Sequence, residues 1–273
     1  MDKNHQERKN EEQIQANKEA WGKISKEHYE NFKVQLADKD FKLNPMVEKE
    51  LGDIRGKKIL HLQCNTGADS ILLARKGATV TGVDLVPDNV YYAGKLAEDF
   101  GMKDLQFIEA DVLKLMEIHE EEYDIVLTTD GVIGWLPDLD QWGRVISYFL
   151  KEDGFFYLHD GHPFMMIFDE EALDRGELDP RYPYFQMTAD YDPMIGGYAS
   201  DAKEAGNYYW GHQFSTIING LLKGNLYVTY LKEYDRCVVG MGGSKADEKG
   251  LWYYPELEGK LPVVFSLKAE KKR

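Results

Sequence analysis

Aspartates end or follow three successive apolar runs in the middle of the chain. The first run ends in Asp84, and Asp111 and Asp130 come directly after the second and the third. In an open α/β sheet, ligands bind beyond the carboxyl ends of the parallel strands, so we expect these carboxylates to line one crevice. Capping of the following helix is the alternative role for any one of them. The ordered series of three favours a shared ligand site.

A tight turn is predicted before these aspartates, in the segment QCNTGAD at 63–69. Gly67 allows a ligand to approach the backbone, and Asn65 is one of the few non-glycine residues that tolerates positive φ. Asp84 stands 17 residues beyond Gly67, which is where an acidic residue accepts the hydroxyl groups of a ribose in a nucleoside site. The turn and this carboxylate together favour a nucleoside ligand.

Histidines supply the candidates for proton transfer. His162 stands two residues past Asp160, where the fifth strand is predicted to leave the sheet. An imidazole titrates near neutral pH, so we predict His162 as the catalytic base for an acceptor that needs one. A structural role before Pro163 is the alternative. His159 and His212 are weaker candidates, since packing or capping suffices to explain them.

Short apolar runs alternate with helical segments from residue 57 onward, which is typical of a parallel sheet covered by helices. Helices are predicted at about 139–150 and 212–223. No convincing helix separates the last two strand candidates, so they can pair antiparallel at the end of the sheet. The seven strand candidates are 57–63, 78–84, 105–110, 123–129, 154–160, 226–234 and 262–269.

The N-terminal region is predicted to be helical and partly exposed. Residues 1–17 are almost wholly polar and charged, which indicates a frayed helix or a mobile arm that orders only on contact. From residue 20 to 32 apolar and aromatic side chains recur at spacings of three and four, as one face of a helix requires. These side chains are Trp21, Ile24, His28, Tyr29 and Phe32.

A segment of about fifty residues, 160–210, interrupts the alternation. Ten of its 51 residues are Phe, Tyr or Trp, against 12% in the whole chain. Loops of this length in compact domains are usually lids, binding inserts or disordered linkers. The aromatic content argues against disorder and predicts a lid or a binding insert.

Composition excludes several classes of function. With 33 basic and 48 acidic residues the net charge is −15, which repels phosphate backbones and anionic lipid, so neither nucleic acid nor a membrane is expected as partner. Cys64 and Cys237 lack CxxC spacing, and the seven histidines show only a weak HDGH pair, so no metal site is predicted. Without an N-terminal apolar region or a run of 18 apolar residues, we expect a cytoplasmic protein. The oligomeric state stays open.

Four segments, in this order and at these spacings, resemble successive motifs of the class I S-adenosylmethionine-dependent methyltransferases. They are KKILHLQCNTG, GATVTGVDLVPDNV, LQFIEADVLKL and YDIVLTTDGVIGWL, and the resemblance extends from about residue 15 to the end. It implies an α/β, Rossmann-like mixed sheet of seven strands in the order 3-2-1-4-5-7-6, with the last strand antiparallel and helices at its sides. It also implies S-adenosylmethionine as cofactor and S-adenosylhomocysteine as product.

By this resemblance, the turn at Gly67 cradles the methionine portion of the cofactor and Asp84 holds the ribose hydroxyls. Asp111 with Val112 frames the adenine, and Asp130 lies near the methionine end or the methyl group. The N-terminal helix resembles the helix that closes over the cofactor in small-molecule methyltransferases. The cofactor-binding residues predicted in this way are Trp21, Tyr29, His61, Gln63, Asn65, Gly67, Asp84, Leu85, Asp111, Val112 and Asp130.

The first motif departs from the family pattern of an acidic residue followed by three glycines at alternate positions. The corresponding residues are His61, Gln63, Asn65 and Gly67, so only the last glycine is kept. Asn65 can replace a glycine at positive φ, because a turn needs permissive torsions more than glycine itself. His61 removes an acid that would face the cofactor's ammonium group, and Asp69 could supply that carboxylate. A core histidine is the alternative for His61.

The leading hypothesis is a methyltransferase acting on a small, partly apolar or aromatic metabolite. Residues 1–50 form the N-terminal arm and lid helices, and 51–273 form the methyltransferase domain, with 160–210 as a substrate lid. A non-catalytic sensor that binds S-adenosylmethionine or S-adenosylhomocysteine is the main alternative. A dehydrogenase of similar topology is the third, although no GxGxxG motif opens a helix after the first strand.

Overall fold

The computed structural model describes residues 3–185, 188–240 and 242–272. The predicted ranges 1–50, 51–273 and 160–210 include a few residues outside this description, namely 1, 2, 186, 187, 241 and 273.

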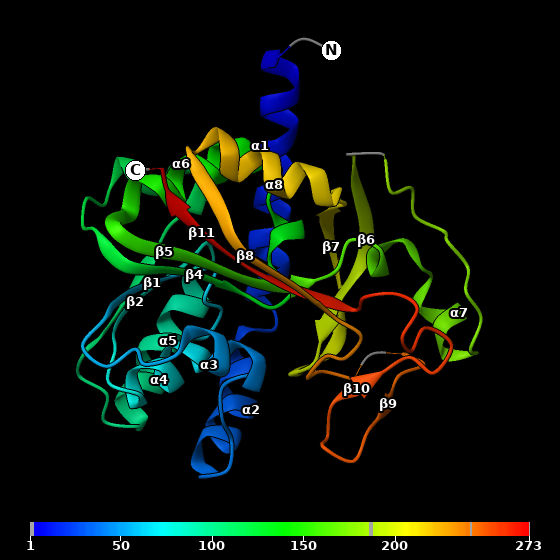
Figure 1. The fold of residues 1–273 in the computed structure, drawn as a ribbon, viewed down its shortest axis with the longest axis horizontal. Coiled ribbons are helices and arrows are strands. Elements are labelled where there is room, and N and C mark those ends of the chain that lie inside the picture. Colours follow the sequence, from blue (N-terminus) through cyan, green and yellow to red (C-terminus); the bar gives the residue numbers. More distant parts are fainter. Residues whose placement is uncertain (1–2, 186–187, 241, 273) are drawn as a thin grey trace.

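A seven-stranded mixed sheet forms the centre of the molecule (Figure 1), in the order β3-β2-β1-β4-β5-β11-β8. Strands β1 to β5 pair in parallel, whereas β11 is antiparallel to both β5 and β8. This confirms the predicted order and the antiparallel last strand. The strands are β1 (Lys58–Leu62), β2 (Thr79–Asp84), β3 (Leu105–Glu109), β4 (Tyr123–Thr129), β5 (Leu150–Gly161), β8 (Leu226–Tyr234) and β11 (Val264–Lys271).

Helices cover both faces of the sheet (Figure 1). One face packs against α6 (Leu139–Phe149), α8 (Phe214–Lys223) and the short turn η1 (Val112–Glu117), around the buried side chains of Trp142 and Phe149. The other face packs against the remaining core helices, which are α2 (Ser25–Ala37), α3 (Pro45–Leu51), α4 (Ala68–Arg75) and α5 (Pro87–Asp99). The two apolar layers hold the strand ends in fixed positions.

Two glycines allow α6 and α8 to lie in backbone contact. A Cβ atom added to Gly143 would stand 2.0 Å from the carbonyl oxygen of Gly220. We therefore expect Gly143→Ala to lower the free energy of unfolding by about 3 kcal/mol, since neither backbone can move aside freely. Gly94 in α5 has open space at its Cβ position, so Gly94→Ala is the matched control and should be neutral or stabilising. Urea unfolding of both variants checks this, and equal effects would contradict it.

The segment predicted as a lid contains a β-hairpin. Strands β6 (Ala189–Gly197) and β7 (Ser200–Trp210) pair antiparallel, and the short helix α7 (Glu170–Asp174) precedes them. In Figure 1 this hairpin stands beside the sheet, and the loop that carries β9 (Lys245–Ala246) and β10 (Trp252–Tyr253) appears lower in the view. Its aromatic side chains therefore belong to a folded element rather than to a linker.

The N-terminal residues form a longer helix than expected. Helix α1 (Lys3–Gly22) packs along β7, and the amide of Asn17 pairs with the backbone of Tyr208. The Asn17 Nδ2 atom donates to the carbonyl of Tyr208 at 2.8 Å, and the Tyr208 N–H donates to Asn17 Oδ1 at 2.6 Å. The contact that orders this polar segment thus lies within the chain. The single helix predicted over 20–32 is wrong, because the chain turns between Gly22 and Ser25.

Candidate functional site

The turn after β1 uses unusual backbone angles. Gln63, Asn65 and Gly67 have φ values of 55°, 51° and 79°, as expected for Asn65 and found for Gln63 and Gly67 as well. Positive φ is rare for residues with side chains and is concentrated at functional sites. A Cβ atom on Gly67 would also stand 2.9 Å from the ring of Phe107. Glycine is therefore required here for packing as well as for φ.

Asp84 ties this turn to the loop after β2. It is 7% exposed, and its carboxylate accepts hydrogen bonds from the Asn65 N–H at 2.8 Å, the Val86 N–H at 3.0 Å and the Asn89 side chain at 3.0 Å. Burial raises the pKa of Asp84, and these bonds offset only part of the effect. The carboxylate is thus a structural cap at the crevice, and its predicted role toward a ribose stays a prediction. Leu85, beside it, is half-buried.

Asp111 lies at the end of the third strand as predicted and caps η1. Its Oδ1 atom accepts the Leu113 N–H at 2.9 Å, and burial raises its pKa. Val112 beside it is 4% exposed and belongs to the apolar core. The capping alternative therefore accounts for the contacts of Asp111, and contact with adenine stays a prediction.

His61 is a core histidine with partners at both ring nitrogens. Nδ1 lies 2.8 Å from Ser70 Oγ and Nε2 lies 3.4 Å from Thr129 Oγ1. Burial lowers the pKa of His61 to about 4, so the ring is neutral near pH 7. The Thr129 hydroxyl also donates to Asp69 Oδ2 at 3.5 Å. Burial and the negative charge of Asp130 raise the pKa of Asp69 to about 7.

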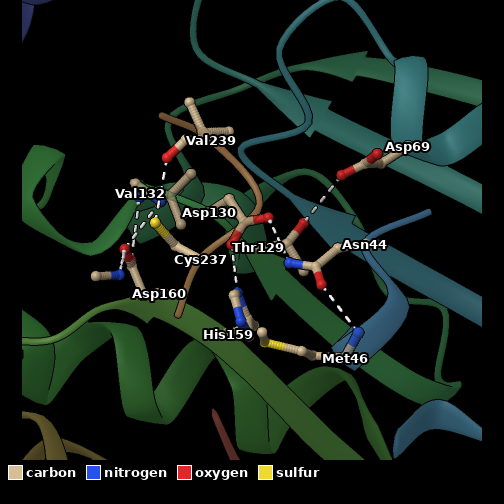
Figure 2. Close-up of polar contacts among 12 residues, drawn as sticks. Asn44, Met46, Asp69, Thr129, Asp130, Val132, His159, Asp160, Cys237 and Val239 are labelled. Carbon is tan, nitrogen blue, oxygen red and sulfur yellow. Dashed lines mark hydrogen bonds and ion pairs between the residues drawn. The ribbon is translucent and has the colours of Figure 1, made fainter. Parts of the chain in front are cut away.

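Asp130 is the most accessible carboxylate of the crevice. Its backbone has φ 48°, and its side chain is 38% exposed. Figure 2 shows it between His159, whose Nδ1 contacts Oδ1 closely, and Asn44, whose Nδ2 donates to Oδ2 at 3.4 Å. Burial lowers the pKa of His159, but Asp130, Asp160 and Glu50 outweigh it and raise the pKa above its ordinary value. The buried imidazole of His159 therefore holds Asp130 at the crevice.

The loop that follows Asp130 is fixed by a second carboxylate. Asp160 accepts hydrogen bonds from the N–H groups of Gly131 at 2.8 Å, Val132 at 3.1 Å and Ile133 at 2.9 Å (Figure 2). Its side chain is buried, and burial raises its pKa. This arrangement sets the direction of the turn that carries Asp130.

Glu50 adds a negative charge beneath His159. Its carboxylate accepts hydrogen bonds from the hydroxyls of Tyr157 at 2.8 Å and Tyr230 at 2.9 Å, and a further short one from Tyr234. Burial raises the pKa of Glu50, but the hydroxyl donors outweigh it and lower the pKa overall. Sequence reasoning missed this cluster, and only the spacing of Tyr230 and Tyr234 on one strand face pointed toward it.

His162 lies in an aromatic stack just past the end of β5. Its ring is parallel to those of Phe164 and Phe214, at centroid distances of 5.3 and 5.4 Å. Nδ1 accepts the Phe164 N–H at 3.2 Å, and Nε2 contacts Glu233 Oε1 at 3.0 Å. Burial lowers the pKa of His162, and Glu233 offsets only part of this. These contacts suit a packing histidine, and the predicted base role stays a prediction.

The structure places the two predicted lid residues differently. The ring centroid of Trp21 lies 5.3 Å from that of Trp135, and the Trp135 centroid lies 5.5 Å from that of Tyr209 on β7. Trp21 therefore joins an aromatic wall beside the crevice. Tyr29 instead stacks on Tyr92 of α5 at 5.1 Å and donates to Asp99 Oδ2 at 2.5 Å. Tyr29 thus fixes α2 to α5 and is not brought to the strand ends.

The tip of the hairpin reaches the carboxylates. Tyr198, between β6 and β7, is 56% exposed, and the negative charges of Asp69, Asp130 and Asp84 raise its pKa. Its ring lies 5.5 Å from that of His28 on α2. Sequence reasoning counted Tyr198 among the aromatic residues of the insert but did not assign it to the site.

The crevice fits the cofactor implied by the motifs. Gln63 Oε1 and Thr66 Oγ1 are buried at the turn without a hydrogen-bond partner among the described residues, and buried polar atoms normally have one. The carboxylates of Asp69 and Asp130 suit a ligand that carries positive charge. Within the described ranges, no group of three or more His, Cys, Asp or Glu side chains is arranged to hold a metal ion. No helix in that part of the chain is long and apolar enough to span a membrane.

Known proteins share parts of this chain. A ubiquinone biosynthesis O-methyltransferase of Actinobacillus pleuropneumoniae is 31% identical over 120 residues, which are 41% of this chain and 50% of the relative. A protein of the same name from Psychrobacter arcticus is 37% identical over 90 residues, 33% of this chain and 34% of the relative. The chain therefore spans half or less of the length of these curated relatives.

Solved structures share the fold over most of the chain. An S-adenosylmethionine-dependent methyltransferase from Mesorhizobium loti is 16% identical with a TM-score of 0.56, covering 83% of this chain and 96% of its own. The DhpI–SAH complex is 14% identical with a TM-score of 0.56, covering 96% and 98%. The family model described as a methyltransferase domain matches residues 53–209. Since this match covers more than half of a chain with the expected strand order, the protein belongs to the methyltransferase-domain family.

Proposed function

We propose that this protein transfers a methyl group from S-adenosylmethionine to a small, partly apolar or aromatic metabolite. The observation that carries the proposal is the aromatic wall of Trp21, Trp135 and Tyr209. The Trp135 indole N–H donates at 2.9 Å to the carbonyl of Gly131, which directly follows the half-exposed Asp130. Such a wall suits a planar or alkyl body. The names of the curated relatives, O-methyltransferases of ubiquinone biosynthesis, are consistent with an aromatic acceptor.

The turn 63–67, Asp84 and the Asp111–Val112 pair would hold the cofactor, with Asp69 facing its ammonium group. S-adenosylmethionine supplies an electrophilic methyl group on a positively charged sulfur. The chain's own task is then alignment, because holding the acceptor in line and close supplies much of the rate. Asp130, fixed by His159 and Asn44, accepts a hydrogen bond or the proton of an acceptor hydroxyl.

Asp84→Ala should weaken S-adenosylhomocysteine binding more than tenfold, because hydrogen bonds to a charged group contribute about 1.5 to 3 kcal/mol each. The variant also loses the links to Asn65, Val86 and Asn89, so its melting temperature should fall. Asp111→Ala is the control and should do less, since it removes one bond to the backbone. Calorimetric titration with a thermal melt checks both. A lower melting temperature at unchanged affinity would leave Asp84 as a cap only.

Cofactor affinity should depend on pH through Asp69. Its pKa is about 7 without ligand, and a neighbouring ammonium group lowers it, so binding releases a proton below pH 7. Affinity for S-adenosylhomocysteine should therefore fall about fivefold from pH 7 to pH 6 and stay nearly level above pH 8. Titrations at four pH values measure this. Asp69→Asn should remove the dependence, and an unchanged slope in that variant would exclude Asp69 as the group responsible.

We propose a small-molecule partner, with no nucleic acid and no membrane. The net charge of −15 supports this, and a relative named an uncharacterized RNA methyltransferase, from Caldanaerobacter subterraneus, matches over only 81 residues. Both cysteines are free and buried, which suits the cytoplasm. We further propose 1–50 as lid helices on a methyltransferase domain of 51–273, with 160–210 as the substrate lid.

A screen of small metabolites for production of S-adenosylhomocysteine tests the proposal. Turnover of a neutral or cationic aromatic compound is expected, and repetition with His162→Ala tests the predicted base. Full activity in that variant would assign His162 to packing. Tight cofactor binding without turnover of any compound would favour the sensor instead, and tight binding of NAD alone would exclude the family's chemistry.

A further inference from the structure

The buried imidazole of His28 on α2 lacks regular hydrogen bonds. It is 1% exposed, and neither of its ring nitrogens has a hydrogen bond of regular geometry among the described residues. The Asn65 side chain interacts with the ring without meeting that geometry. Leaving a buried donor or acceptor unsatisfied is costly, so native proteins do so mainly where another molecule supplies the partner. His28 is therefore a candidate for contact with a ligand.

The ring of His28 lies between Trp21 of α1 and Tyr198 at the tip of the hairpin. It contacts Trp21 edge to face at 5.7 Å and Tyr198 at 5.5 Å. The side chain of Asn65, at the positive-φ turn, lies close enough to act on the pKa of His28. The imidazole thus stands above the turn that the motifs assign to the methionine portion of the cofactor.

Hydrogen bonds fix this position. Ser25 Oγ donates to Asn89 Oδ1 at 2.6 Å, and Asn89 Nδ2 donates to Asp84 Oδ1 at 3.0 Å. Ser25 and His28 are three residues apart on α2, so they face the same way. The start of α2 is therefore locked to the turn itself, and His28 is carried with it.

The chemistry of the ring suits an anionic partner. Burial lowers the pKa of His28 to about 4, although Asn65 and Glu27 act in the opposite direction. The neutral ring then offers one N–H donor. The neighbouring Glu27 carboxylate is already paired with Lys203 Nζ at 2.5 Å. The carboxylates near Tyr198 would repel a ligand that carries only negative charge. A ligand with an amino acid end brings both an ammonium group, which suits Asp69, and a carboxylate, which needs a donor.

We propose that His28 donates a hydrogen bond to the carboxylate of the cofactor's methionine portion. Helix α2 then contacts the amino acid end of the ligand through His28, while the turn and Asp84 hold the nucleoside end. This inference rests on the proposed cofactor site and adds a positioning residue to it.

Two ligands that differ in this carboxylate test the proposal on the full chain. Isothermal titration with S-adenosylmethionine and with decarboxylated S-adenosylmethionine gives two affinities for each variant. His28→Phe, which keeps an aromatic ring against Trp21 and Tyr198, should lose at least about tenfold for S-adenosylmethionine and less than twofold for the decarboxylated ligand. His28→Gln keeps an N–H donor and should recover most of the loss.

The outcomes separate this inference from the function on which it rests. His28→Phe should melt no lower than the unchanged protein, because it removes nitrogens that lack regular hydrogen bonds, so weaker binding cannot be assigned to unfolding. Equal losses for both ligands, or no loss for either, would overturn the role of His28 and leave the methyltransferase site intact. If the unchanged protein binds neither ligand, the proposed cofactor site itself fails.

Discussion

Asp130→Asn should lower kcat/KM for the methyl acceptor about a hundredfold, the low end of what a positioned proton acceptor contributes. Asparagine tolerates positive φ, so the backbone at φ 48° is kept while the charge is lost. Because this residue is proposed to face the acceptor, the affinity for S-adenosylhomocysteine should change less than threefold. Initial rates at saturating cofactor, with calorimetric titration of the product, measure both quantities.

The control is Glu152→Gln, which removes one negative charge at a side chain that is 81% exposed. It should leave both quantities unchanged, since exposed charges are strongly screened. If Asp130→Asn lost cofactor affinity as strongly as rate, Asp130 would be a ligand of the methionine end instead. Full activity in Asp130→Asn would remove it from the chemistry altogether.

Deletion of residues 1–22 should abolish S-adenosylhomocysteine binding while the sheet stays folded. Helix α1 supplies Ala20 and Trp21 to a small cluster with Ile195 and Ala205 of the hairpin, so its loss opens the lid on one side. The cut ends before Ser25, because the following helix packs into the core of the sheet. Circular dichroism and calorimetry on the truncated protein check the two halves of this expectation.

Asn17→Ala provides a milder companion to the deletion. It removes the two hydrogen bonds to Tyr208 and leaves the apolar contacts, so cofactor affinity should fall by a smaller factor. In the full chain, saturating S-adenosylhomocysteine should slow proteolysis near residue 20. A truncated protein that binds normally, or cleavage that ligand does not slow, would show that α1 is no lid.

The sheet and the turn could be predicted because they depend on local patterns. Strand order followed from the motifs and from the missing helix between β8 and β11, and Asn65 at positive φ followed from the conformational preference of asparagine. The face of a short helix could not be predicted in the same way. Tyr29 and His28 are neighbours in a helical pattern, but only packing decides that Tyr29 meets Asp99 of α5 while His28 contacts Trp21 and Tyr198.

Contacts between distant residues explain the other differences. His162 was chosen for its place after β5, but Phe214, 52 positions later, and Glu233 enclose the ring. Glu50 meets hydroxyls from residues 107 and 180 positions away. Such side chains carry no local signal, since the pairing is set by how the helices and strands pack.

The pairing of Asn17 with Tyr208 has a consequence for the order of folding. These residues are 191 positions apart, so during synthesis α1 leaves the ribosome long before the strand that receives it exists. Contacts of large sequence separation form slowly, and domains generally fold from the N-terminal end as the chain emerges. Helix α1 would therefore wait for β7 before it docks. Its side of the crevice would thus form after the five parallel strands β1 to β5 have been made.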